Sequence, residues 1–167
     1  MSQSGNHAIV SRLMDENVRG LVLYARQWDA ANAEDLVQEA FLRLLTESPL
    51  PDSPKAWLYR VVRNLAIDHA RRAKKMPQHT DIGSWFEPLA VAADDTTMEK
   101  VTSELDLTHA LEQLPQAIRE IIISKVWGNL NFREIAELTG RPISSVHYDY
   151  QRGIKMLRKE LGARDEK

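Results

Sequence analysis

Apolar residues recur at helical spacing along most of the chain, and no segment shows the sustained alternation that is typical of a strand. Residues 7–28 place one apolar stripe along a helix, residues 33–46 and 55–73 repeat the pattern, and shorter helical segments follow after residue 106. The stripe of the first segment comprises Ile9, Leu13, Val18, Leu21, Val22 and Ala25. We therefore expect an all-α protein.

Prolines and caps suggest where these helices begin and end. Asn32 precedes two acids that favour the positive end of a helix dipole, so it is a predicted N-cap. Two prolines in residues 47–53 predict a loop, and Ser53-Pro54 predicts the start of the next helix. The helical pattern fails after Met76. We expect two small helical domains, residues 1–75 and 106–167, joined by a flexible acidic linker at 76–105.

The last third of the chain has the spacing of a helix-turn-helix. A short helix over 132–138 is predicted to start at Asn131, which has capping-box spacing with Glu134. Gly128 is predicted to close the helix before it, over 116–126, whose predicted buried residues are Ile118, Ile121, Ile122 and Val126. Ala136 is small enough for a second helix to cross closely, and Gly140 gives the backbone the freedom that a sharp turn needs. Ile143 is expected to fill the turn as an apolar plug, and Val146 is expected to pack inward. A plain helical hairpin is the alternative, but this combined spacing favours a DNA-binding module.

The final helix, from residue 143 or 144 to 161, would present a polar face to the major groove. Its side chains can donate to base edges and phosphates. The candidates for DNA contact are Ser144, Ser145, His147, Tyr148, Gln151, Arg152 and Lys155. Asp149 would repel phosphate, so it either faces away from DNA or accepts a hydrogen bond from cytosine.

The distribution of charge supports a nucleic-acid partner although the net charge is −2. Seven Lys or Arg lie between Lys55 and Lys75 against one Asp, and four lie between Ser144 and Lys159 against one Asp. An acidic stretch separates these two basic blocks. The two basic blocks suggest two surfaces that face DNA. The alternative is that they are ordinary charged helix faces exposed to solvent. Trp57 and Tyr59 add aromatic groups on which unstacked bases can rest, although the core is the simpler place for Trp57.

Several classes of protein are excluded or disfavoured. The absence of cysteine excludes a disulfide scaffold, a thiolate zinc finger and a cysteine nucleophile. The five histidines are scattered without metal-ligand spacing, and no phosphate-binding glycine loop is present. We therefore expect no enzyme activity, no cofactor and no metal. We also expect no membrane insertion and no secretion signal, and hence a cytoplasmic protein.

Three stretches together resemble the bacterial sigma-70 family, in particular sigma factors of the extracytoplasmic-function (ECF, group 4) type. They are AEDLVQEAFLRLL at residues 33–45, AWLYRVVRNLAIDHARR at 56–72, and ALEQLP at 110–115 followed by FREIAELTG at 132–140 and SSV at 144–146. The resemblance implies a subunit that binds core RNA polymerase and directs promoter-specific initiation. It gives residues 1–75 the role of sigma region 2 and residues 106–167 the role of region 4.

The resemblance also implies a role for each candidate surface. The polar face of the helix over 33–46 would bind the clamp helices of the largest polymerase subunit, through Asp35, Gln38, Glu39 and Arg43. The loop over 47–53 and the helix after it would recognise and melt the minus-ten element, through Leu50, Arg60, Arg63, Asn64, Asp68, Arg71 and Arg72. The final helix would recognise the minus-thirty-five element, and the polymerase flap is a further implied contact.

The chain departs from the family at two places. The loop over 47–53 is shortened and rich in proline, and the run His147-Tyr148-Asp149 replaces residues that are usually basic, small and basic. Neither base preference can therefore be transferred to this chain. The acidic linker suits a basic channel of the polymerase, and a solvated tether explains its composition equally well. An anti-sigma protein is another partner that the resemblance implies.

The alternative function is a stand-alone helix-turn-helix regulator with an N-terminal helical dimerisation or sensing domain. The helix with Asp35 and Arg43 and the basic helix that follows it discriminate between the two hypotheses, because a repressor needs neither.

Overall fold

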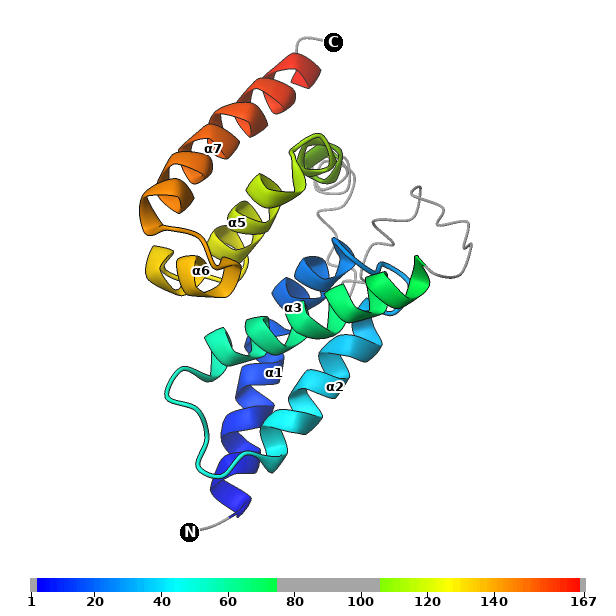
Figure 1. Cartoon of the computed structure of the whole chain (residues 1–167), viewed down its shortest axis with the longest axis vertical. Coiled ribbons are helices and arrows are strands. Elements are labelled where there is room, and N and C mark those ends of the chain that lie inside the picture. Colours follow the sequence, from blue (N-terminus) through cyan, green and yellow to red (C-terminus); the bar gives the residue numbers. More distant parts are fainter. Residues whose placement is uncertain (1–2, 75–105, 166–167) are drawn as a thin grey trace, which may run out of the picture.

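The computed structural model describes residues 3–74 and 106–165, and all regular structure within them is helical (Figure 1). The first domain contains α1 (Gln3–Arg26), α2 (Ala33–Thr46) and α3 (Pro54–Ala73). The second contains a helical segment at residues 106–112, then α5 (Gln116–Val126), α6 (Phe132–Thr139) and α7 (Ile143–Asp165). The prediction of an all-α chain with two helical domains is confirmed. The predicted linker lies outside the described residues.

In the first domain, α1, α2 and α3 pack against one another around a single core. The large side chains at its centre are almost completely buried, among them Leu21, Phe41 and Leu58. Burial of apolar area of this kind contributes about 25 cal/mol per Å², which makes it the main stabilising term for three short helices. The core holds the polar faces of α2 and α3 in fixed orientations.

The helices α2 and α3 start at the predicted positions, but not through the predicted side-chain caps. Pro54 is the first residue of α3, and Asn32 and Ser53 occupy the N-cap positions of α2 and α3. Neither side chain accepts a capping hydrogen bond. The amide of Asn32 instead donates to the Asp29 carboxylate at 3.1 Å, so it orders the turn before α2.

The helix-turn-helix forms as its local sequence predicts. The side chain of Asn131 accepts from the Glu134 backbone N–H at 2.8 Å, and the Glu134 carboxylate accepts from the Asn131 N–H at 3.0 Å. Gly140 ends α6 with φ 68°, a left-handed conformation that glycine adopts without strain. Val146 is fully buried. These local interactions set the angle at which α7 leaves α6.

Four apolar residues that we expected inside are exposed by between 37% and 52%: Ile9, Val18, Val126 and Ile143. For α1, the buried residue at its start is Val10, which is one helix step of about 100° away from Ile9. In the turn before α7, Ile143 does not fill the turn as predicted. Val146, one helical turn later, is the residue that is buried.

The two domains pack against each other, with α1 against α5 and α3 against α6 (Figure 1). Ile121 and Ile123 join the core of the first domain, whereas Ile122 joins the separate core of the second domain with Leu114 and Leu157. The helix α5 is therefore buried on two sides. Gly128 also serves this contact, because a Cβ there would lie 2.8 Å from the Tyr59 hydroxyl.

Candidate nucleic-acid interface

The start of α7 carries a polar face that neighbouring elements leave open. Ser144, His147, Tyr148, Gln151, Arg152 and Lys155 are exposed, and Ser145 is half-buried. Tyr148 is 66% exposed, although it is a large side chain. An exposed aromatic ring on a polar helix face can contact a thymine methyl group or a sugar, while serine, glutamine and arginine supply hydrogen bonds. The structure thus brings the predicted minus-thirty-five candidates together on one helix.

The His147 ring is held by its neighbours. It lies against Phe132 of α6 with ring centroids 4.0 Å apart, and Tyr150 meets the same Phe132 ring edge-on at 5.3 Å. Lys125 places its Nζ 4.6 Å from the Phe132 centroid. Phe132 therefore fixes the direction of His147 on the face of α7.

Asp149 does not face outward with these residues. Its carboxylate accepts from Arg141, in the turn before α7, and only 13% of the Asp149 side chain is exposed. The pair neutralises the negative charge and ties the turn to the second helical turn of α7. Of the two interpretations of Asp149, the one in which it faces away from DNA agrees with this contact.

Basic and polar side chains also line α3. Arg60, Asn64, Asp68, Arg71 and Arg72 are exposed. They share the exposed side of the helix, because its opposite side buries Leu58, Tyr59, Val62 and Ala66 in the core. Arg63 differs from the others, because it points to the second domain and forms an ion pair there.

The loop before α3 gives little exposed apolar surface. Leu50 is half-buried and packs against the core of the first domain, and the Ser48-Pro49 peptide bond is cis. Trp57 packs against the same core. Tyr59 is fully buried, so our expectation that it supports an unstacked base is wrong. Its ring instead fills the space between α1 and α5.

The polar face of α2 is accessible as predicted. Asp35, Gln38 and Arg43 are exposed and Glu39 is half-buried. Arg43 forms an ion pair with Glu39 at 2.8 Å, one helical turn earlier. Exposed pairs of this kind contribute little to stability, typically about 0.3–0.5 kcal/mol, so a protein partner can recruit either residue at small cost.

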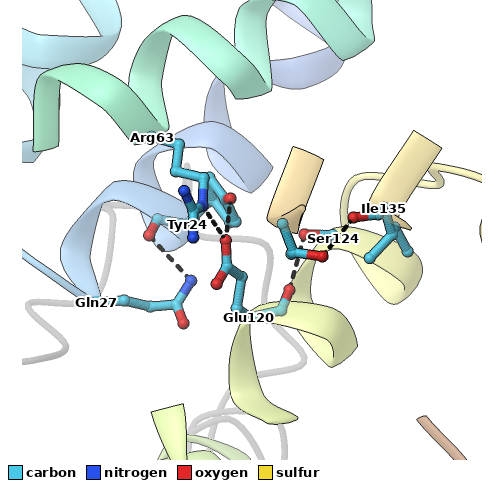
Figure 2. Close-up of polar contacts among 7 residues, drawn as sticks. Tyr24, Gln27, Arg63, Glu120, Ser124 and Ile135 are labelled. Atoms are coloured by element: carbon cyan, nitrogen blue, oxygen red, sulfur yellow. Dashed lines mark hydrogen bonds and ion pairs between the residues drawn. The ribbon is translucent and has the colours of Figure 1, made fainter. Parts of the chain in front are cut away.

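A buried polar cluster joins the domains (Figure 2). Glu120 of α5 accepts from the Tyr24 hydroxyl at 2.6 Å and from Arg63 Nε at 2.5 Å. Burial and the adjacent Glu120 charge raise the pKa of Tyr24 well above its usual value of 10. Burial alone would lower the pKa of Arg63, but its hydrogen bond to Glu120 and the charge of Glu120 raise it. Tyr24 therefore stays neutral and Arg63 charged at neutral pH.

Comparison with known proteins agrees with this arrangement of two domains. The family model "Sigma-70 region 2" matches residues 13–76 and "Sigma-70, region 4" matches residues 104–157. The ECF RNA polymerase sigma factor SigW of Bacillus subtilis is 33% identical over 77% of this chain and 75% of its own length. SigL of Mycobacterium tuberculosis is 30% identical over 93% of this chain and 92% of its own. The chain belongs to the sigma-70 family, as an ECF-type sigma factor.

Two solved structures share the fold of this sigma factor. The sigma factor RpoE of Bartonella quintana, in complex with the anti-sigma factor NepR, has a TM-score of 0.65 and 23% identity over 91% of this chain and 95% of its own. CnrH, in complex with the cytosolic domain of CnrY, has a TM-score of 0.61 and 19% identity over 96% of this chain and 92% of its own.

An ECF sigma factor directs promoter-specific transcription initiation, and this is the function of the chain. Core RNA polymerase and DNA are its partners by membership of the family. The family consists of transcription factors and not of enzymes. Within residues 3–74 and 106–165, no helix is long and apolar enough to cross a membrane, and no group of three potential metal ligands is found.

The buried cluster of this sigma factor was not predicted from its sequence. Tyr24 and Glu120 are far apart in the sequence, and neither stands out as a functional residue. Three consecutive isoleucines at 121–123 were the available signal, because consecutive residues on a helix point in different directions and need more than one apolar partner. They indicate that a second surface covers α5, but not which one.

Proposed function

We propose that the two domains of this sigma factor divide promoter recognition between them. The second domain, residues 106–167, recognises the minus-thirty-five element through α7, and it also contacts the polymerase flap. The main support is the exposed polar face of α7, which the capped α6 orients and which the packing of the two domains leaves uncovered. The residues proposed for DNA contact are Ser144, Ser145, His147, Tyr148, Gln151, Arg152 and Lys155.

The first domain, residues 1–75, binds core polymerase and recognises and melts the minus-ten element. The exposed polar face of α2 supports polymerase binding at the clamp helices, through Asp35, Gln38, Glu39 and Arg43. The basic face of α3 supports DNA contact through Arg60, Arg63, Asn64, Asp68, Arg71 and Arg72, with Leu50 in the preceding loop. Residues 76–105 connect the two domains within the polymerase.

An anti-sigma protein is a further proposed partner. RpoE, which shares the fold, was solved with the anti-sigma factor NepR, and CnrH, which also shares it, was solved with the cytosolic domain of CnrY. We also propose the cytoplasm as the compartment of the chain, because core polymerase works there.

Transcription in vitro with core polymerase over a promoter library tests the division of labour. Substitution of a proposed base-contacting residue, Gln151→Ala or Arg152→Ala, should change the preferred upstream element and lower transcription by about 5- to 150-fold, since a good base contact is worth about 1–3 kcal/mol. Lys159→Ala removes a charge from an exposed position later on α7 and serves as the matched control.

Substitutions in the first domain should act at a different step. Asn64→Ala and Leu50→Ala should reduce open-complex formation, measured by permanganate reactivity of unpaired thymines, with the upstream preference unchanged. If Arg152→Ala affected only melting and Asn64→Ala affected only upstream preference, the assignment of the two domains would be wrong.

A further inference from the structure

The aromatic ring of Phe132, the first residue of α6, contacts side chains from two other helices. From α7, the His147 ring lies against it with centroids 4.0 Å apart and the planes inclined by 37°, and Tyr150 meets it edge-on at 5.3 Å. From α5, Lys125 places its Nζ 4.6 Å from the Phe132 centroid. Phe132 therefore ties the last turn of α5 and the first turns of α7 to the start of α6.

The backbone that carries the Phe132 ring is itself held in place. Asn131 and Glu134 form the reciprocal hydrogen bonds of a capping box on either side of Phe132 in the sequence. Ile135, in the next helical turn, is fully buried. A ring that projects from a capped and packed helical turn is a rigid support, because local hydrogen bonds fix the backbone from which it projects.

His147 differs from a freely rotating side chain on the surface of α7. It is exposed, and Ser144 and Gln151, three residues before it and four after it, share its stripe of the helix. An exposed side chain ordinarily samples several rotamers, and its ordering on binding costs free energy. The contact with Phe132 restricts the His147 ring before any DNA is bound, so this ordering cost is reduced.

We propose that Phe132 is a specificity-determining positioning residue, which holds the His147 ring so that a ring N–H donates to one base edge of the minus-thirty-five element. The proposal rests on the proposed function, because it takes His147 to contact that element. A hydrogen bond weakens steeply as its angle departs from linear, so discrimination between bases depends on the direction of the ring. Phe132 acts through His147 and needs no contact with DNA of its own.

Competition between promoters that differ in the upstream element tests this role in the full-length chain with core polymerase. Phe132→Leu keeps an apolar side chain but has no ring to lie against His147. It should lower discrimination about 2- to 10-fold at one base position, the position that His147→Ala also affects. Phe132→Tyr keeps the ring and should retain the discrimination. In the His147→Ala background, Phe132→Leu should have no further effect at that position.

A matched substitution in the core of α6 separates positioning from stability. Ile135→Val removes a methylene group from a fully buried position of the same helix, so it should lower the melting temperature and leave the base preference unchanged. If Phe132→Leu weakened all upstream positions equally, or affected a position other than that of His147→Ala, the proposal would be wrong.

Nuclear magnetic resonance of the free chain tests the contact without DNA. The His147 ring-proton signals, assigned by their loss in His147→Ala, should lie upfield of their positions in Phe132→Leu, because the Phe132 ring current shields them. Identical positions in the two chains would contradict a ring that is held in advance.

The outcomes distinguish this proposal from the proposed function. If His147→Ala, Gln151→Ala and Arg152→Ala all leave the preferred upstream element unchanged, the proposed function of α7 fails and the role of Phe132 fails with it. If these three variants change the preference but Phe132→Leu does not, the function of α7 stands and only the role of Phe132 is overturned.

Discussion

Tyr59 lies close to Gly20 near the domain boundary, and a double substitution there gives a quantitative prediction. A Cβ on Gly20 would lie 2.6 Å from the Tyr59 hydroxyl, whereas its next neighbour, the Trp127 carbonyl oxygen, would be 3.2 Å away. The hydroxyl oxygen is therefore the nearest obstacle to an alanine at position 20, and the Trp127 carbonyl is a second, milder one. Tyr59→Phe removes the hydroxyl oxygen and leaves the ring in place.

The expected magnitudes follow from two opposing terms. Gly20 lies inside α1, where alanine is favoured over glycine by about 0.8–1.0 kcal/mol. Overpacking against the Tyr59 hydroxyl costs about 1–3 kcal/mol, so Gly20→Ala alone should lower the free energy of unfolding or leave it nearly unchanged. In the Tyr59→Phe background only the milder contact with the Trp127 carbonyl remains, so the same substitution should be more favourable than in the wild type by about 1–3 kcal/mol. We expect a coupling of about 1–3 kcal/mol between the two sites.

Tyr59→Phe by itself should be neutral or stabilising. The Tyr59 hydroxyl is buried and has no hydrogen-bond partner among the described residues. An unsatisfied buried hydroxyl costs about 1–3 kcal/mol, which its removal recovers, apart from the small void that it leaves.

Urea unfolding followed by circular dichroism, applied to the wild type, both single variants and the double variant, measures this coupling. Thermal melts give a second estimate, since 1 kcal/mol corresponds to about 2–4 °C for a chain of this size. Gly162→Ala in α7 is the matched control, because a Cβ there meets no atom within 4 Å and tests helix propensity alone. If the two single effects add to within about 0.5 kcal/mol, the hydroxyl is not the obstacle at position 20 and the reasoning fails.

Three further predictions concern the cap of α6, the turn before α7 and the buried tyrosine. Asn131→Ala should cost about 1 kcal/mol of stability in a melt, because it removes the capping box of an eight-residue helix, whereas Asn131→Ser keeps a capping oxygen and should lose much less. Asp149→Ala should weaken binding of duplex promoter DNA in an anisotropy titration, because Arg141 loses the partner that ties the turn to α7; unchanged binding would exclude this positioning role. The raised pKa of Tyr24 predicts stability that is fully present below about pH 10 and is lost as the pH rises toward the folded-state value, and the alkaline fall in melting temperature should be shallower in Tyr24→Phe.

Local signals in the sequence were sufficient for the second domain's helix-turn-helix. The reciprocal bonds of Asn131 and Glu134, and the left-handed Gly140, depend on residues within a few positions of each other. Interactions of this kind are determined by spacing alone, so a pattern of residue types predicts them well. The same holds for Pro54 at the start of α3 and for the polar faces of α2 and α7.

Which surface covers each helix was decided only by the tertiary structure. The pattern of α5 predicted a helix, but it put Val126 inside and did not include Ile123, because the second partner of this helix comes from the other domain. Periodicity shows that a residue is apolar and on which face it lies, but it does not show which distant element will bury that face.

Arg63 shows the same limit at a functional residue. By sequence it is one of several candidates for DNA contact along α3, with nothing to distinguish it from its exposed neighbours Arg60 and Asn64. In the structure it alone is paired with Glu120, 57 residues away in the chain. The sequence determined the helices, the capping box of α6 and the family. The folded chain determined that Arg63 faces a carboxylate, because a buried charge pair depends on which surfaces meet in three dimensions and not on local spacing.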